Sequence, residues 1–178
     1  MKDALQKAAD HFGGIDILVN NASAIDNRST AALSPKRYDL MHSINGRGTF
    51  MVSKYALPHL LKGSNPQVLN LSPPLDCLDP PGQPAVPEWF RLCGVGYSMA
   101  KFNMSMCAIG MAEEYRGRVG FSCLWPRTAI ATAAIENLAG EACHVTRARA
   151  ASPPAFHPAT RRYFVLPHPP CRSASRRA

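Results

Sequence analysis

Residues 15–22, Ile-Asp-Ile-Leu-Val-Asn-Asn-Ala, carry the strongest indication of the fold of this 178-residue chain. Positions 15–19 form a short, nearly continuous apolar run, which is the pattern of a strand buried on both faces of a parallel sheet. Residues 2–11 predict the end of a helix, closed by Gly13 and Gly14, because glycine readily adopts the positive φ of a helix C-terminus. A helix that leads directly into a buried strand indicates an α/β fold.

Two further pairs of helix and strand follow along the chain. Ser34 and Pro35 are typical of a helix start, and the helical pattern continues to about residue 61, with a late kink expected at Pro58. A helical pattern returns from residue 89 or 97 to residue 115. Residues 67–71 and 119–124 are the second and third strand candidates. This alternation predicts right-handed crossovers and a parallel sheet.

The net charge of +8 is concentrated at the C-terminal end of the chain. Residues 1–141 carry a net charge of only +1, whereas residues 142–178 hold seven arginines and no acidic residue. Binding of nucleic acid by the whole domain is therefore not indicated. We predict one domain over residues 1–141 and a disordered tail rich in Arg, Pro and Ala over residues 142–178. A basic arm and the product of a shifted reading frame are the two alternatives for the tail.

The remaining composition argues against several classes of protein. The six cysteines form no pair or cluster at zinc spacing, so we expect free thiols and no metal site. No apolar run approaches the roughly 18 residues of a membrane-spanning helix. The N-terminus lacks the apolar segment of a secretory signal. These observations favour a cytoplasmic protein without a membrane span.

Tyr97 and Lys101 are the first candidate catalytic pair. They lie four residues apart in a predicted helix, which places a phenol and an ammonium group on one helix face. A nearby cation stabilises the phenolate, so Lys101 is expected to lower the pKa of Tyr97. The same spacing also arises between unrelated surface and core residues.

Other polar residues stand at positions where a ligand could bind. Ser72 follows the second strand, at the carboxyl edge where open α/β sheets bind ligands, although a simple Ser-Pro turn would also explain it. Asn45 precedes Gly46 inside a predicted helix, which is locally unfavourable and indicates a packing or functional reason. Asn20 and Asn21 follow the first strand and would either line a crevice or form an Asx turn.

The order of these motifs resembles the short-chain dehydrogenase/reductase family over about residues 10–140. A strand is followed by Asn-Asn-Ala, a helix carries Asn-x-x-Gly-x-Phe, a strand ends in Ser, a helix carries Tyr-x-x-x-Lys, and a strand is followed by Pro. Several phrases resemble the hydroxysteroid dehydrogenase-like group more narrowly: HFGGIDILVNNAS (11–23), LSPPL (71–75), WF (89–90), MSMC (104–107), GMAEEY (110–115) and LWPRTAI (124–130).

The resemblance implies an oxidoreductase that transfers a hydride between a nicotinamide cofactor, NAD or NADP, and a small carbonyl or alcohol substrate. Tyr97 would be the proton donor or acceptor, and Lys101 would lower its pKa and bind the nicotinamide ribose. Ser72 would polarise the carbonyl, and Asn45 would hold a water that relays protons to Lys101. The cofactor cleft would be bordered by Asn20, Asn21, Ala22, Lys101, Pro126 and Thr128.

The sequence departs from the family at its beginning. The family opens with a strand and a glycine-rich turn that cradles the cofactor's pyrophosphate, and no such segment is present here. The expected fold is therefore a partial Rossmann-like doubly wound parallel sheet that lacks its first strands and leaves the edge of the strand at 15–19 unpaired. Ser23 also stands where the family usually has glycine.

Two functions follow from this resemblance. The first is an NAD(P)-dependent oxidoreductase whose activity the missing phosphate loop puts in doubt. The alternative is a catalytically inactive fragment that forms a homo- or heterodimer through the helices at 35–61 and 97–115, which carry Asn45 and Tyr97. By resemblance, a peroxisomal or mitochondrial location is the alternative to the cytoplasm.

Overall fold

The structure is a computed structural model that describes residues 1–73 and 93–124 and the backbone of residues 163–165. Its elements in chain order are the helices and strands α1 (Lys2–Phe12), β1 (Ile17–Asn20), α2 (Pro35–His42), the π-helix η1 (Ser43–Arg47), α3 (Gly48–Leu60), β2 (Gln67–Asn70), α5 (Val95–Glu114), β3 (Gly120–Cys123) and β4 (Tyr163–Val165).

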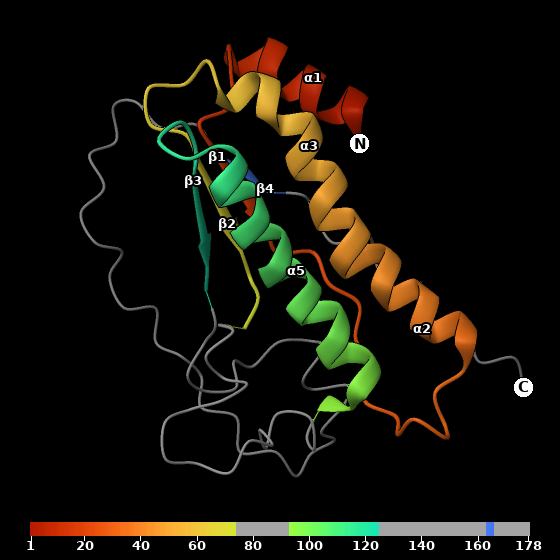
Figure 1. Ribbon diagram of the computed structural model, residues 1–178. Coiled ribbons are helices and arrows are strands. Elements are labelled where there is room, and N and C mark those ends of the chain that lie inside the picture. The colour runs from red at the N-terminus through yellow and green to blue at the C-terminus, as the bar shows by residue number, and fades with distance from the viewer. Residues whose placement is uncertain (74–92, 125–162, 166–178) are drawn as a thin grey trace, which may run out of the picture.

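The strands form one parallel sheet in the order β3-β2-β1-β4. Leu18 of β1 pairs with Val68 of β2, and Val68 pairs in turn with Phe121 of β3. The predicted α/β fold with a parallel sheet is thereby confirmed. Figure 1 shows α1, α3 and α5 arranged along one side of this sheet.

The core lies between that side of the sheet and the helices. Leu18 and Val68 point into a cluster with Leu5 of α1 and Leu60 of α3, and all four are at most 1% exposed. Burying each such side chain stabilises the fold by about 1.5–3 kcal/mol. The alternate residues of β1 and β2 are only half-buried among the described residues, so the strands show one fully buried face rather than the two predicted.

The predicted helix over residues 35–61 is divided into three segments. Figure 1 shows α2 and α3 as one continuous rod, with the five-residue π-helix η1 between them. Such π turns are rare and occur frequently at functional sites. Pro58 lies within α3, which ends two residues later at Leu60.

The edge of β1 is occupied by a short strand from the tail. Ile17, Leu18 and Val19 pair in parallel with β4 (Tyr163–Val165), so the expected unpaired edge carries a partner. The other residues from 142 onward lie outside the described residues, and their predicted disorder stays a prediction. Within the described part of the chain, no helix combines the length and apolar character needed to cross a membrane.

Candidate active site

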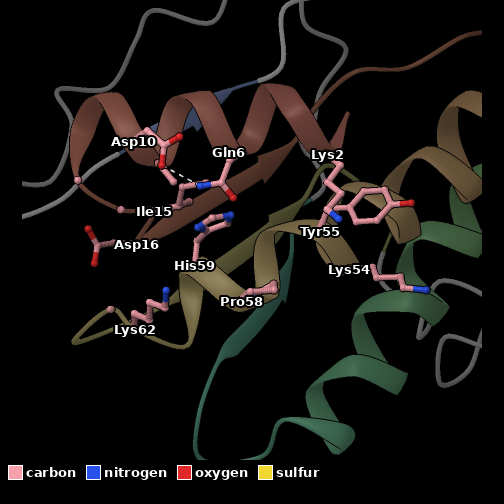
Figure 2. Close-up of a pocket in the computed structure, with 14 residues that line it drawn as sticks. Lys2, Gln6, Asp10, Ile15, Asp16, Lys54, Tyr55, Pro58, His59 and Lys62 are labelled. Carbon is pink, nitrogen blue, oxygen red and sulfur yellow. Dashed lines mark hydrogen bonds between the residues drawn. The ribbon is translucent and has the colours of Figure 1, made fainter.

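Two cavities lie at opposite ends of β1. The first, of about 780 Å³, opens between α1 and α3 next to Ile15 and Asp16, which precede the strand. Figure 2 shows Asp10 and Gln6 of α1 above His59 of α3, with a 2.8 Å hydrogen bond from Gln6 Nε2 to Asp10 Oδ1. No predicted site residue lines this cavity. It lies at the amino end of the sheet, away from the edge where ligands of open α/β sheets bind.

The second cavity, of about 200 Å³, lies at the carboxyl end of β1. Its lining includes Asn20, Asn21 and Ala22, together with Arg47 of η1 and Thr49 of α3. Asn20, which ends β1, and the two residues that follow it therefore border one cavity. Its position agrees with the ligand-binding edge of this class of sheet.

Buried amides connect the strands at this end of the sheet. Asn20 Nδ2 donates to Asn70 Oδ1 at 2.8 Å and to Ser53 Oγ of α3 at 3.0 Å. Asn70 Nδ2 donates to the carbonyl oxygen of Met104 in α5 at 3.0 Å. The two amides thus join β1, β2, α3 and α5. Asn70 was not predicted as a site residue. The sequence signal that could have identified it is that two neighbouring strands, β1 and β2, both end in asparagine.

Asn45 is fully buried in η1, and its amide binds the loop after β1. Asn45 Oδ1 accepts a hydrogen bond from the Ala24 backbone N–H at 2.9 Å, and Asn45 Nδ2 donates to the Ala24 carbonyl at 2.8 Å. The amide therefore bonds both backbone polar groups of Ala24. Its predicted role of holding a water stays a prediction.

Tyr97 lies in the first turn of α5, packed with Met41 and Ala100 and with the loop residues Ala24 and Ile25. Burial raises the pKa of Tyr97 to about 12, while an interaction with the Ser23 side chain opposes this rise. The expected lowering of the pKa of Tyr97 by a lysine is therefore not the net effect here, because burial of the phenol dominates. At neutral pH the phenol holds its proton.

Lys101 is 3% exposed, one helical turn beyond Tyr97. Its Nζ donates to the Leu71 carbonyl at 2.5 Å. Burial lowers the pKa of Lys101 to about 8, because removing an ammonium group from water disfavours its charged form. This side chain can therefore take up or release a proton near neutral pH.

Ser72 lies beyond the end of β2 and is fully buried. Its backbone N–H donates to the Leu124 carbonyl at 3.1 Å, and the Leu71 N–H donates to the Asn20 carbonyl at 3.1 Å. Ser105 Oγ of α5 donates to the Pro73 carbonyl at 2.5 Å. This short segment is thus held on both sides of Ser72.

The Ser72 hydroxyl itself is different, because its Oγ has no hydrogen-bond partner among the residues that the structure describes. Lys101 binds the carbonyl of the preceding residue, so Ser72 and Lys101 come together through Leu71. Pro126 and Thr128, the remaining predicted cofactor residues, lie outside the described residues. Over residues 1–73 and 93–124, no group of three or more His, Cys, Asp or Glu could hold a metal ion.

Comparison with known proteins identifies the family of this chain. The family model of short chain dehydrogenases matches residues 1–140. Hydroxysteroid dehydrogenase-like protein 2 of Danio rerio is 51% identical over 140 residues, which are 79% of this chain and 32% of that protein. The chain thus spans about a third of the length of this relative.

Solved structures show the same fold. A short chain dehydrogenase from Mycobacterium thermoresistibile is 44% identical with a TM-score of 0.65, over 78% of this chain and 46% of that one. A gluconate 5-dehydrogenase from Burkholderia cenocepacia, solved in complex with NADP and tartrate, is 21% identical with a TM-score of 0.62, over 79% of this chain and 51% of that one. This chain belongs to the short chain dehydrogenase family.

Proposed function

We propose that this chain carries the reacting end of an NAD(P)-dependent oxidoreductase that acts on a small carbonyl or alcohol. The observation that carries the proposal is the buried Ser72 hydroxyl, which has no hydrogen-bond partner within residues 1–73 and 93–124 and lies one residue beyond the carbonyl that Lys101 binds. A buried hydroxyl without a partner is costly unless something else binds it. A substrate carbonyl is the acceptor that fits this donor.

The residues present fit the nicotinamide end of such a cofactor. The cavity bordered by Asn20, Asn21 and Ala22 adjoins the end of the sheet at which Ser72 lies. The described residues contain no G-x-G-x-x-G turn after a strand, so they offer no such cradle for the pyrophosphate. When bound, the reduced cofactor supplies a hydride to the carbonyl carbon.

The side chains then supply the proton and stabilise the charge that develops on the carbonyl oxygen. The Ser72 hydroxyl donates a hydrogen bond to the carbonyl oxygen, and the Tyr97 phenol transfers its proton to that oxygen as the carbon–oxygen double bond becomes single. The pKa of about 12 keeps Tyr97 protonated at neutral pH, which suits the direction of carbonyl reduction. Lys101, with a pKa of about 8, restores the proton on Tyr97.

Calorimetric titration of the full chain with NADH and NADPH tests this proposal. Binding with a Kd below about 1 mM, worth roughly 4 kcal/mol, is expected for at least one of the two. Oxidation of that cofactor with a panel of aldehydes and ketones should then fall by about 10²–10⁴-fold in Tyr97→Phe. Tyr115→Phe, which removes a hydroxyl near the other end of α5, is the matched control. Failure of both cofactors to bind would overturn the proposal.

A second function, assembly with another copy, is favoured by the outer face of α5. Val95, Met99, Met106 and Ile109 are between 44% and 57% exposed, and Phe50 of α3 is 45% exposed. An apolar stripe of this kind on a helix surface marks a protein interface. The family resemblance implies that these helices pair in a dimer, so we propose a second copy of this chain as the occupant.

Sedimentation velocity at micromolar concentration tests the dimer. The unmodified chain is expected to sediment as a dimer, and Met106→Lys, which places a charge in the stripe, is expected to give monomers. Gln6→Lys on α1 is the control, because that exposed residue lies outside the stripe. An unmodified chain that sediments as a monomer would exclude this function.

A further inference from the structure

The loop that follows β1 contains one buried carboxylate, Asp26, which is 6% exposed. Asp26 Oδ1 accepts hydrogen bonds from the Arg28 backbone N–H at 3.2 Å and from Arg28 Nε at 2.9 Å. Asp26 Oδ2 accepts from Arg28 Nη2 at 2.5 Å and from Arg37 Nε of α2 at 2.9 Å. These bonds, Arg28 first, hold the pKa of Asp26 far below its usual range. Charge-assisted bonds of this kind are stronger than neutral ones.

The same loop lies directly against the start of α5. A Cβ atom at Gly94 would lie 2.9 Å from the Arg28 carbonyl oxygen and 3.2 Å from the Asn27 carbonyl oxygen. Gly94 also has a φ of 68°, which glycine adopts at least cost. The backbone beside Asp26 therefore contacts the residue that precedes α5, three positions before Tyr97.

Toward its other end, the loop reaches the site itself. Ala24 and Ile25 pack in the cluster around Tyr97, and Ala24 also binds Asn45. Ser23 interacts with the Tyr97 phenol. Residues 23–28 thus touch α2, η1 and α5, and Asp26 is the residue of this segment that binds a charged partner on a helix.

We propose that Asp26 is a positioning residue that, through Arg28 and Arg37, holds residues 23–28 against α5 so that the Ser23 hydroxyl meets the phenol of Tyr97. This inference deepens the proposed function, because it names what controls the phenol that donates the proton. Titratable and charged groups on the elements packed around Tyr97 include Cys93 just before α5, Lys101 and Cys107 on α5, Asp26 and Arg28 in the loop, Lys36, Arg37, Tyr38, Asp39 and His42 on α2, and Arg47 on η1.

Asp26 binds Arg28 and Arg37 at 2.5–3.2 Å, and Ala24 and Ile25 of the same loop pack against Tyr97. Loss of the Asp26 charge should therefore change the environment of the phenol. Without the Asp26 charge, Arg28 and Arg37 lose the carboxylate that both of them bind. The loop is then less firmly attached to α2, and Ser23 becomes more mobile. The interaction with Ser23 opposes the rise in the pKa of Tyr97, so loosening it moves that pKa further upward. The turnover rate would fall as the pKa of Tyr97 rises. The change in that pKa can be measured on the phenol itself, without any cofactor.

The test uses the full chain labelled with ¹³Cζ-tyrosine, in which Tyr97→Phe identifies the Tyr97 signal. Ser23→Ala and Asp26→Asn are expected to shift that signal in the same direction. The double variant is expected to match Ser23→Ala alone, because Asp26 acts through Ser23. Asp10→Asn, which removes an exposed carboxylate on α1, is the control and should leave the signal in place.

A melting temperature that drops in Asp26→Asn while the Tyr97 signal stays in place would overturn the proposal and leave Asp26 with a purely structural role. If Asp26→Asn does not fold, Arg37→Gln, which removes a half-exposed partner, is measured in its place with the same two outcomes. No step of this test needs NADH, NADPH or turnover. A chain that binds no cofactor but shows the shift would therefore refute the proposed reaction and retain this inference.

Discussion

The two ends of β1 place polar groups in opposite environments. At the amino end, Asp10, Asp16 and His59 line a cleft in which they are exposed or half-buried (Figure 2). At the carboxyl end, Asn20 and Asn70 are buried. Exposed pairs contribute little to stability, whereas buried polar groups are costly when they lack a partner. The larger cavity therefore lies at the end without the buried amides, and the predicted site residues lie at the end with the smaller one.

The largest effect is expected from Asn70→Ala. The substitution removes the acceptor of Asn20 Nδ2 and the donor to the Met104 carbonyl, and it leaves both of those groups buried. We expect a loss of about 3 kcal/mol in the free energy of unfolding, since a buried polar group that loses a partner costs about 1–3 kcal/mol and Asn20 Nδ2 keeps only its bond to Ser53 Oγ. Urea denaturation at neutral pH measures it. A loss below about 1 kcal/mol would show that the two ends of the strand do not differ as described.

Burial of Lys101 is expected to change the free energy of unfolding by a similar amount, but in a pH-dependent way. Its pKa is about 8 in the folded chain and near 10.5 when unfolded, so the unfolded state binds more protons between these values. The free energy of unfolding should therefore rise with pH from about 8 to 10. Above pH 10 the raised pKa of Tyr97 works in the opposite direction, because the unfolded phenol ionises first.

Lys101→Met separates the two contributions. The variant should lose the rise between pH 8 and 10, which amounts to at most about 3 kcal/mol on the scale of 1.4 kcal/mol per pKa unit. Denaturation curves recorded at pH 7, 8, 9 and 10 give the slope for both chains. Lys54→Met, on the exposed side of α3, is the control and should keep the rise. Equal slopes for the unmodified chain and Lys101→Met would contradict the burial argument.

The smallest effect is expected at the amino end. Asp10→Asn removes a carboxylate that accepts one exposed hydrogen bond from Gln6. We expect a change within about 0.5 kcal/mol, as for most exposed pairs. The same urea series as for Asn70→Ala measures it, ideally on one day with one stock. A loss approaching that of Asn70→Ala would mean that the cleft between α1 and α3 is more than a solvated surface.

Much of this arrangement could be predicted from short stretches of the chain. The apolar run at 15–19, the Ser34-Pro35 helix start and the Tyr97–Lys101 spacing each depend on local periodicity, and the structure contains the corresponding elements. The parallel order followed from the alternation of helices and strands. Asn20, Asn21 and Ala22 line one cavity, whereas Lys101, which was predicted for the same cofactor cleft, is not among its lining residues. The predicted cofactor cleft stays a prediction. The catalytic roles assigned to these residues stay predictions.

Other features depend on residues that are far apart in the sequence. Asn45 binds Ala24, which lies 21 positions away in the sequence, and Asn20 binds Asn70, which lies 50 positions away. No local sequence pattern predicts either pair. Ser23 was visible only as a departure from the family pattern. Its interaction with Tyr97 joins residues 74 positions apart, in the loop that we propose Asp26 holds in place.

The kinds of element, their order and the family can be read from the sequence, because they depend on periodicity and on motifs a few residues long. The chemistry of the side chains depends instead on how the chain packs in three dimensions. Burial, which depends on every packed neighbour, raises the pKa of Tyr97 and lowers that of Lys101. The same packing leaves the Ser72 hydroxyl without a partner among the described residues. Spacing places groups on one helix face, but the surrounding core determines which of them hold a proton.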